Sequence, residues 1–459
     1  MDITTRTPAR FFWAGVLMLL VGFYAVGTLY AVYTPIWQAP DEPAHYNYIR
    51  EIVETGQLPV IDFQDYDQAY LSRLTSEGFP PELSVDGVRY EGHQPPLYYL
   101  LAVPVYGVSG GSVLVLRLFS LALGGVTVLS AVLAARTLFP GADWLALGVG
   151  VFVAFVPQHV AILASVNNDS LAGAVLAVGL WQLFVMMRRG ADDPAAWARV
   201  GVVVALAIAT KTTVYLFALA AALGWLLTVW DGRGWRPGWT TRAVWVAAGW
   251  LVLPGVAVAM VWWGRNVLTY GWPDFLGLIQ HDLVVIGQPR TEEWVVQYGL
   301  GEVLQRLVNT TFNSFWGQFG WMGVPMPSRY YTALWGFVVL VLAGWGMTVW
   351  ARPSVDEHQR RGLAVLVAVT VLAFAAFGYY NLSFVQHQGR YLFPALIPLG
   401  VGVMGGLWGW WWLVRQGLQR GWADGVRWWS PWWVVVGLAW MPLLCVWALF
   451  RFIVPSLGG

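Results

Sequence analysis

Long apolar runs recur along the whole sequence, and no other feature restricts the fold as strongly. Each run is close to the ~20 residues that a helix needs to cross a bilayer at a rise of about 1.5 Å per residue. Apolar residues make up 58% of the 459 residues and charged residues only 11%. This is too little charge to cover the surface of a water-soluble protein of this size. The sequence therefore predicts an all-α polytopic membrane protein.

Eleven runs are predicted to be transmembrane helices, and two choices determine this number. The run 95–108 is short and contains Pro104, so we expect an interfacial helix there. The stretch 195–230 is too long for one span and is divided at Lys211. The first run is too long for a cleavable signal core, so we expect an uncleaved signal anchor. The predicted spans are 11–33, 113–135, 143–165, 169–187, 195–211, 213–230, 243–264, 331–350, 362–380, 391–414 and 431–453.

Arginine placement predicts which side of the membrane each loop faces. With a cytoplasmic N-terminus, the short loops around Arg188 and Arg360 fall in the cytoplasm, as the positive-inside rule requires. The two long loops, 34–112 and 265–330, are then extracytoplasmic and hold most of the acidic residues. We expect one integral membrane domain over residues 1–459. The net charge of +1 gives no bulk field that would attract nucleic acid.

The first long loop opens with an acidic pair that is a candidate catalytic site. Asp41 and Glu42 stand between two prolines and precede an amphipathic helix that begins near Pro43. A carboxylate at the hydrocarbon boundary is partly desolvated, which raises its pKa and its basicity. His45 lies about one turn further on and is placed to face Asp41. The alternative is that Asp41 and Glu42 only cap a surface helix.

Two more polar segments fall at the same predicted face. His93 stands before Gln-Pro-Pro, where the paired prolines fix the start of a second interfacial helix. The alternative for His93 is a turn with an interfacial histidine. Asn168 and Asp169 follow Asn167 at the mouth of a predicted span, where polar side chains are costly unless they face a wet cavity. Helix capping by Asn168 or Asp169 is the alternative there.

Three basic residues are predicted at the outer ends of spans, which the positive-inside rule disfavours. They are Lys211, Arg265 and Arg390, and Lys211 is the one lysine of the chain. A bound phosphate would compensate these charges through charge-assisted hydrogen bonds. The alternative is that they snorkel toward lipid head groups.

The segment 311–322 mixes aromatic side chains, glycines and amides beside a span, and it includes Trp316 and Gln318. Such a mixture suits a sugar or an isoprenoid tail, and it also suits ordinary anchoring at the membrane interface. Asp41, His45 and Asp169 are candidate ligands for a divalent cation, but no close ligand spacing supports a metal site, and none is assigned.

Together these motifs resemble the GT-C superfamily of membrane glycosyltransferases. Asp41 and Glu42 with His45, and the segment 93–97 that closes the first loop, are similar to the Asp-Glu-x-His and His-Pro-Pro-Leu motifs of protein O-mannosyltransferases, each here one residue longer. The chain looks closest to an uncharacterised bacterial membrane family. That family has Pro-Asp-Glu-x-x-His, an Asn-Asn-Asp step and a late Gln-Gly-Arg-Tyr-x-x-Pro, found here at 388–394.

The resemblance implies a GT-C-like fold and a polyprenyl-phosphate-linked sugar as donor. The reaction would take place at the extracytoplasmic face of the bacterial cytoplasmic membrane, with a glycan, lipid or protein acceptor. Asp41 would be the general base on the acceptor hydroxyl, and direct displacement at the anomeric carbon would invert its stereochemistry. We assign the donor phosphate to Lys211, Arg265 and Arg390. The candidate acceptor- and sugar-binding residues are Glu42, His45, His93, Asn168, Asp169, Trp316 and Gln318.

Three other functions remain alternatives. A transporter or flippase of lipid-linked glycans predicts polar groups on the inner side and an alternating path, and the sequence has no inverted repeat that would favour it. A lipid-linked polymer ligase would share the fold class and take a pyrophosphate donor. A non-catalytic scaffold predicts that Asp41→Asn has no effect.

Overall fold

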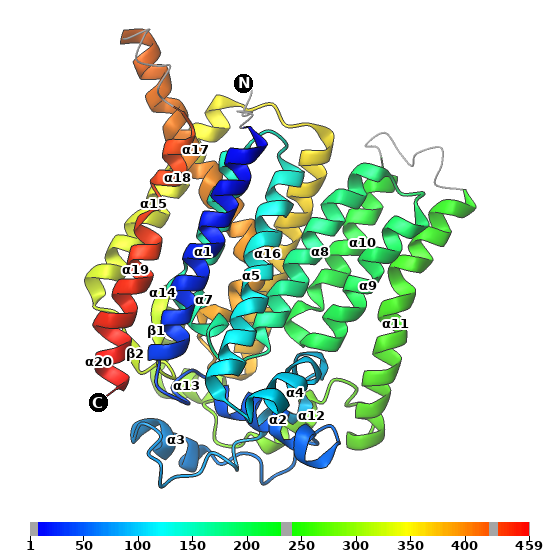
Figure 1. Cartoon of the computed structure of the whole chain (residues 1–459), viewed down its shortest axis with the longest axis vertical. Coiled ribbons are helices and arrows are strands. Elements are labelled where there is room, and N and C mark those ends of the chain that lie inside the picture. Colours follow the sequence, from blue (N-terminus) through cyan, green and yellow to red (C-terminus); the bar gives the residue numbers. More distant parts are fainter. Residues whose placement is uncertain (1–7, 231–240, 422–429, 459) are drawn as a thin grey trace.

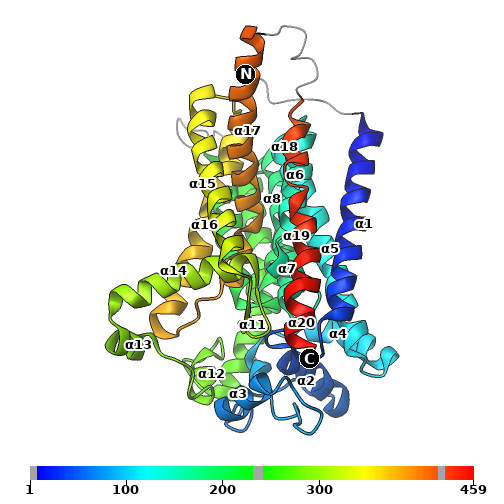
Figure 2. The same cartoon turned by 90° about the vertical axis from the view of Figure 1, so that its left-hand side faces the viewer.

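The computed structural model describes residues 8–230, 241–421 and 430–458. Long helices run side by side along one axis, and the elements of both long loops, 34–112 and 265–330, gather at one end of the bundle (Figures 1 and 2). The predicted all-α polytopic architecture is therefore confirmed.

In the described ranges, nine helices are long and apolar enough to cross a membrane, or ten if one bent pair counts as a single span. Each of them corresponds to a predicted apolar run. The longer helices within the predicted apolar runs are α1 (Ala9–Tyr33), α5 (Val113–Leu138), α8 (Asp169–Arg189), α9 (Pro194–Thr210), α10 (Leu216–Val229), α11 (Arg242–Tyr270), α15 (Ser328–Ala351), α16 (Glu357–Ser383) and α17 (Leu396–Gly421).

Shorter elements complete the remaining apolar runs. They are α6 (Asp143–Ala154), α7 (Pro157–Leu163), η2 (Thr212–Val214), η4 (Gly389–Ala395), α18 (Trp432–Val436), α19 (Trp440–Ala448), the π-helical turn η6 (Leu449–Ile453) and α20 (Val454–Leu457).

The described ranges give nine or ten candidate spans where eleven were predicted, and two local features account for the difference. The run 143–165 is not one straight helix, because α6 and α7 meet at 67°. Pro157 has no N–H to continue the helix and keeps Val156 extended, with φ −73° and ψ 117°. The run 195–211 forms α9, an apolar helix of 17 residues that lies at the lower end of the lengths that can span a bilayer and is not among these candidates. The predicted division at Lys211 is confirmed, since this residue is extended and ends α9.

The two long loops carry short helices, as predicted. In the first loop these are α2 (Glu42–Thr55), α3 (Gln68–Ser76), η1 (Tyr90–His93) and α4 (Leu97–Ser109). The second loop has α12 (Leu278–Val284), α13 (Thr291–Tyr298), α14 (Leu300–Gly317) and the antiparallel strands β1 (Gln318–Phe319) and β2 (Val324–Pro325). The 13-residue α4 is the helix that we expected to be too short to cross the membrane.

The first half of α2 is buried under the end of the bundle. Ala44, Tyr48 and Ile49 are almost fully covered, whereas Val53 near the other end of α2 is exposed. Burying this apolar face anchors the start of α2. The chain just before it, with Asp41, is thereby carried into the interior.

Candidate active site

The backbone of Asp41 has an unusual conformation, which directs its side chain into the site. It precedes α2 with φ 65° and ψ −1°, a left-handed conformation that is uncommon for a residue with a side chain. Within the described residues its side chain makes no capping hydrogen bond to α2. The capping alternative therefore does not describe Asp41. Its carboxylate turns instead toward residues from distant parts of the chain, and such local strain is typical of functional sites.

The carboxylate of Asp41 is held by an arginine and a tyrosine. Arg390 Nη2 lies 2.5 Å from Oδ2, and the Tyr90 hydroxyl donates to Oδ1 at 2.7 Å. Arg390 is on η4, and its Nε and Nη1 are buried without a hydrogen-bond partner among residues 8–230, 241–421 and 430–458. A buried N–H group without a partner is costly, so this guanidinium is suited to a ligand that accepts hydrogen bonds.

A second ion pair lies in the same electrostatic neighbourhood. Lys211 Nζ contacts Asp169 Oδ1 at 2.6 Å, which joins the extended residue after α9 to the first turn of α8. A narrow cavity is lined by both Asp169 and Arg390. Two of the three predicted basic residues, Lys211 and Arg390, therefore come to one region, each facing an aspartate.

The pKa of Asp41 is lowered, whereas its position in the sequence predicts a raised pKa. Burial does raise the pKa of Asp41, but the charge of Arg390 and the hydrogen bonds from Tyr90 and Arg390 outweigh it and lower the pKa to about 2. The expected raised pKa is therefore wrong for this state. The expectation counted desolvation alone and could not include a counter-charge that arrives from residue 390.

His45 belongs to a hydrogen-bonded chain of polar side chains. Its Nδ1 and the hydroxyl of Tyr99 are 2.9 Å apart, and Asn168 Nδ2 donates to the same hydroxyl at 3.3 Å. Burial, followed by the positive charge of Lys211, lowers the pKa of His45 to about 3, so the imidazole is neutral at pH 7. Asn168 Oδ1 is buried and has no hydrogen-bond partner in the part of the chain described.

Glu42, next to Asp41 in the sequence, pairs with a different arginine. Its carboxylate forms a two-pronged pair with Arg117, with Nε to Oε1 at 2.7 Å and Nη2 to Oε2 at 2.6 Å. The backbone N–H groups of Trp37 and Val166 donate to the same carboxylate, both at 3.1 Å. Glu42 is fully buried by these contacts, which favours a structural role over acceptor binding.

His93 and Arg265 make contacts that tie the two long loops together. His93 Nδ1 donates to the carbonyl oxygen of Tyr90 at 3.1 Å, and its ring centre lies 4.3 Å from that of His281. Arg265 Nη2 donates to the carbonyl oxygen of Pro59 at 2.5 Å. Arg265 therefore does not point its guanidinium at the Asp41–Arg390 pair.

Trp316 and Gln318 do not line the cavity of Asp169 and Arg390. Trp316 is buried in an apolar groove of about 540 Å³ that is formed by α14, α15, α16 and α17. Gln318 Nε2 donates to the carbonyl oxygen of Met322 at 2.8 Å, inside the turn that connects β1 and β2. The groove is almost wholly apolar, which suits an isoprenoid tail better than a sugar.

Residue 389 must be glycine for η4 to lie where it does. A Cβ atom at Gly389 would lie 2.3 Å from the backbone nitrogen of Phe315 and 2.4 Å from the carbonyl oxygen of Thr311, both on α14. The N–H of Gly389 donates to Ser314 Oγ at 2.8 Å. Arg390 is thus set directly against the helix that walls the apolar groove.

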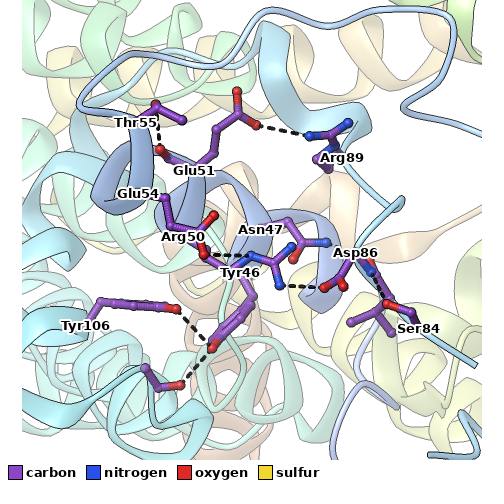
Figure 3. A network of polar contacts seen from close by, with 12 residues as sticks. Tyr46, Asn47, Arg50, Glu51, Glu54, Thr55, Ser84, Asp86, Arg89 and Tyr106 are labelled. Atoms are coloured by element: carbon purple, nitrogen blue, oxygen red, sulfur yellow. Dashed lines mark hydrogen bonds and ion pairs between the residues drawn. The ribbon is translucent and has the colours of Figure 1, made fainter. Parts of the chain in front are cut away.

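Two site residues were missed in the sequence. Tyr90, which donates to Asp41, and Glu91, a buried carboxyl beside it, form η1 immediately before the His-Gln-Pro-Pro segment. A polar network on the outer side of α2 holds the chain that leads into η1. Arg50 contacts Asp86 at 2.5 Å (Figure 3), and Asn47 Nδ2 donates to the carbonyl oxygen of Val88 at 2.9 Å. The only sequence signal for these two residues is their position next to the motif.

The arrangement does not form a cation site. No group of three histidine, cysteine, aspartate or glutamate side chains within the described ranges is placed to hold a metal ion. Asp41 and Asp169 each face a basic side chain instead. Asp41, His45 and Asp169 therefore do not come together as ligands of a divalent cation.

Comparison with known proteins assigns the chain to a family. Residues 85–399, well over half of the chain, match the family described as "Predicted membrane protein (DUF2142)". The chain belongs to this family. No curated protein matches the sequence.

Two solved structures have a similar fold. ArnT from Cupriavidus metallidurans bound to undecaprenyl phosphate matches with a TM-score of 0.50 and 14% identity, over 98% of this chain and 74% of ArnT. The oligosaccharyltransferase of Archaeoglobus fulgidus in complex with zinc and sulfate matches with a TM-score of 0.51 and 13% identity, over 93% of this chain. The chain covers 53% of that archaeal enzyme. This DUF2142 protein therefore has a GT-C-like fold.

Proposed function

We propose that this protein transfers a sugar from a polyprenyl-phosphate donor to an acceptor hydroxyl. The reaction would take place at the extracytoplasmic face of the bacterial cytoplasmic membrane. The observation that carries the proposal is Arg390, which holds Asp41 with one nitrogen and keeps two further buried N–H groups beside it. Such a guanidinium is suited to the oxygens of a phosphate. The fold shared with ArnT, whose structure contains undecaprenyl phosphate, supports the donor class.

In this proposal the donor lies across η4. Arg390 and Lys211 bind its phosphate on one side, and the apolar groove that contains Trp316 accepts its isoprenoid tail on the other. Basic groups at the phosphate stabilise the negative charge that develops on the departing oxygen. Arg265 is left out of the donor site because its guanidinium binds the loop at Pro59.

Asp41 would act as the general base on the acceptor hydroxyl. A donor phosphate shares the charge of Arg390, which weakens its hold on Asp41 and raises the pKa of that carboxylate from its low resting value. The activated hydroxyl attacks the anomeric carbon from the side opposite the phosphate, so the stereochemistry is inverted. Asn168 and neutral His45 are placed to bind acceptor or sugar hydroxyls.

The test is sugar transfer by purified protein from polyprenyl-phosphate sugars. Asp41→Asn keeps the shape of the side chain and removes the base, so we expect a rate loss on the order of a hundredfold or more. Asp86→Asn is the matched control, because Asp86 also contacts an arginine at 2.5 Å but on the exposed side of the same loop (Figure 3). Equal turnover by wild type and Asp41→Asn would contradict the role of Asp41. No transfer by wild type from any of several donors would favour the transporter, polymer-ligase or scaffold alternatives.

A further inference from the structure

Glu91 is a buried acid for which the proposed function has so far given no role. It lies on η1, directly after the Tyr90 that donates to Asp41, and 8% of its surface is exposed. Its Oε2 atom is buried and lacks a hydrogen-bond partner within residues 8–230, 241–421 and 430–458. Burying a carboxylate oxygen without a hydrogen-bond partner costs free energy, so we expect a specific role for Glu91.

The charges around Glu91 are already paired with one another. Asp41 pairs with Arg390 and Asp169 with Lys211, which leaves Glu91 as a third acid beside two bases. Burial, and then the charge of Asp41, raise the pKa of Glu91 to about 7, although Lys211 and Arg390 act to lower it. The phenol groups that also interact with Glu91 come from α2, η1, α4 and α16, and they are Tyr48, Tyr90, Tyr99 and Tyr380.

The proposed reaction produces a proton and a negative charge in the same small volume. The acceptor hydroxyl loses its proton, and the bond between the sugar and the phosphate breaks with its electron pair going to the phosphate oxygen. If the proton stays in the site, the net charge there does not change during transfer. Even when the donor raises the pKa of Asp41, Arg390 and Tyr90 beside it favour its charged form, so Asp41 is a poor place to keep the proton. The buried carboxyl of Glu91, whose pKa is raised to about 7, is a better one.

We propose that Glu91 receives the proton that Asp41 takes from the acceptor hydroxyl, and releases it to water when the lipid phosphate leaves. This inference rests on the proposed function. The acceptor oxygen bonds to the anomeric carbon, the bond to phosphate breaks, and the proton passes through Asp41 to Glu91. Glu91 thus acts through Asp41 and needs no contact with the sugar.

The first test needs no substrate. Infrared spectra of the purified protein are recorded between about pH 5 and about pH 9, and the C=O stretching band of a protonated carboxyl is followed. We expect one such band to disappear with a midpoint near neutral pH in wild type and to be absent from Glu91→Gln. Glu51→Gln is the matched control and should keep the band, because Glu51 is a partly buried acid of the same loop whose pKa is also raised by burial (Figure 3). A band that persists in Glu91→Gln overturns the proposal.

The second test is the pH dependence of kcat/KM for transfer, which reports groups of the free enzyme. Since Glu91 must be ionised to accept a proton, the wild-type value should rise with pH through neutrality and then level off. Glu91→Gln should lose this rise and fall about tenfold or more below wild type on the alkaline side. Glu91→Asp should keep the rise with a shifted midpoint, which a purely structural role would not produce.

The outcomes separate this inference from the function on which it rests. A wild type that transfers sugar with the same pH dependence as Glu91→Gln overturns the role of Glu91 alone. A wild type that transfers no sugar contradicts the proposed function, and the role of Glu91 in transfer then falls with it.

Discussion

Two adjacent acids of the chain are each paired with a buried arginine, and the two pairs are built differently. We call the pair of Glu42 and Arg117 closed, because the N–H groups of its guanidinium are all used. Arg117 donates to both carboxylate oxygens and also to the carbonyl oxygens of Ala31, Thr34 and Pro35. Asp41 and Arg390 are open, because Arg390 reaches the carboxylate with one nitrogen and holds two more N–H groups beside a cavity.

This difference separates a structural ion pair from a candidate catalytic one. A buried pair whose donors and acceptors are all used has nothing left to offer a ligand, and breaking it leaves an uncompensated charge. A buried pair with spare donors is costly in the resting state and gains partners when a ligand arrives. The left-handed backbone of Asp41 turns two neighbouring acids to these two different partners.

The largest expected effect is on the stability of the closed pair. Glu42→Gln puts an amide NH₂ among donors from Arg117, Trp37 and Val166, so we expect a loss of about 3–5 kcal/mol in the free energy of unfolding. Asp41→Asn should cost clearly less, because Arg390 already tolerates spare N–H groups. Thermal unfolding of both variants in the same detergent measures the contrast, with Asp86→Asn as the exposed control. Equal destabilisation by the two changes would remove the distinction between a closed and an open pair.

The next effect concerns donor binding by the open pair. Losing one charged hydrogen bond costs about 1.5–3 kcal/mol, so Arg390→Gln and Lys211→Gln should each weaken donor binding by roughly ten- to a hundredfold. Arg265→Gln should change it by less than about twofold, because its guanidinium is bound to the loop at Pro59. Titration of a labelled polyprenyl phosphate measures all three. A result in which Arg265 matters and Lys211 does not would place the phosphate elsewhere.

The smallest effect tests whether the open pair serves a lipid. Trp316→Leu removes part of the groove wall, so we expect affinity for long-chain polyprenyl phosphates to fall about threefold to tenfold. Affinity for a short-chain analogue should stay unchanged, since it lacks the tail that reaches the groove. Trp250→Leu, on the exposed face of α11, is the control. The same loss for both chain lengths would show that Trp316 supports the site without touching the tail.

The sequence predicted most of the helices, but it did not predict which side chains the charged residues contact. Long apolar runs mark spans because the requirement to fill the bilayer acts on each segment separately. Even there, the bend at Pro157 and the short α9 leave nine or ten candidate spans in the described ranges, against eleven predicted. The region of Asp41, Asp169, Lys211 and Arg390 was predicted because each breaks the local pattern of the span or loop around it.

The pairing within the site depends on contacts that no local pattern records. Asp41 meets Arg390 across 349 positions of the chain, and this counter-charge reverses the pKa direction that burial alone predicts. Arg265 and Gln318 have suitable side chains in suitable segments, yet their hydrogen bonds go to nearby loops. Glu91 was missed because only the folded chain reveals a buried acid without a base of its own.

The missing side chain at Gly389 has a mechanical consequence. At Gly389 the backbone of η4 packs directly on the backbone of α14, so no side chain at this point can absorb a displacement. A movement of α14 at this point would therefore be passed to Arg390, one residue further on. Under the proposed function, insertion of a lipid tail into the groove would thus be coupled to the position of the guanidinium at its head.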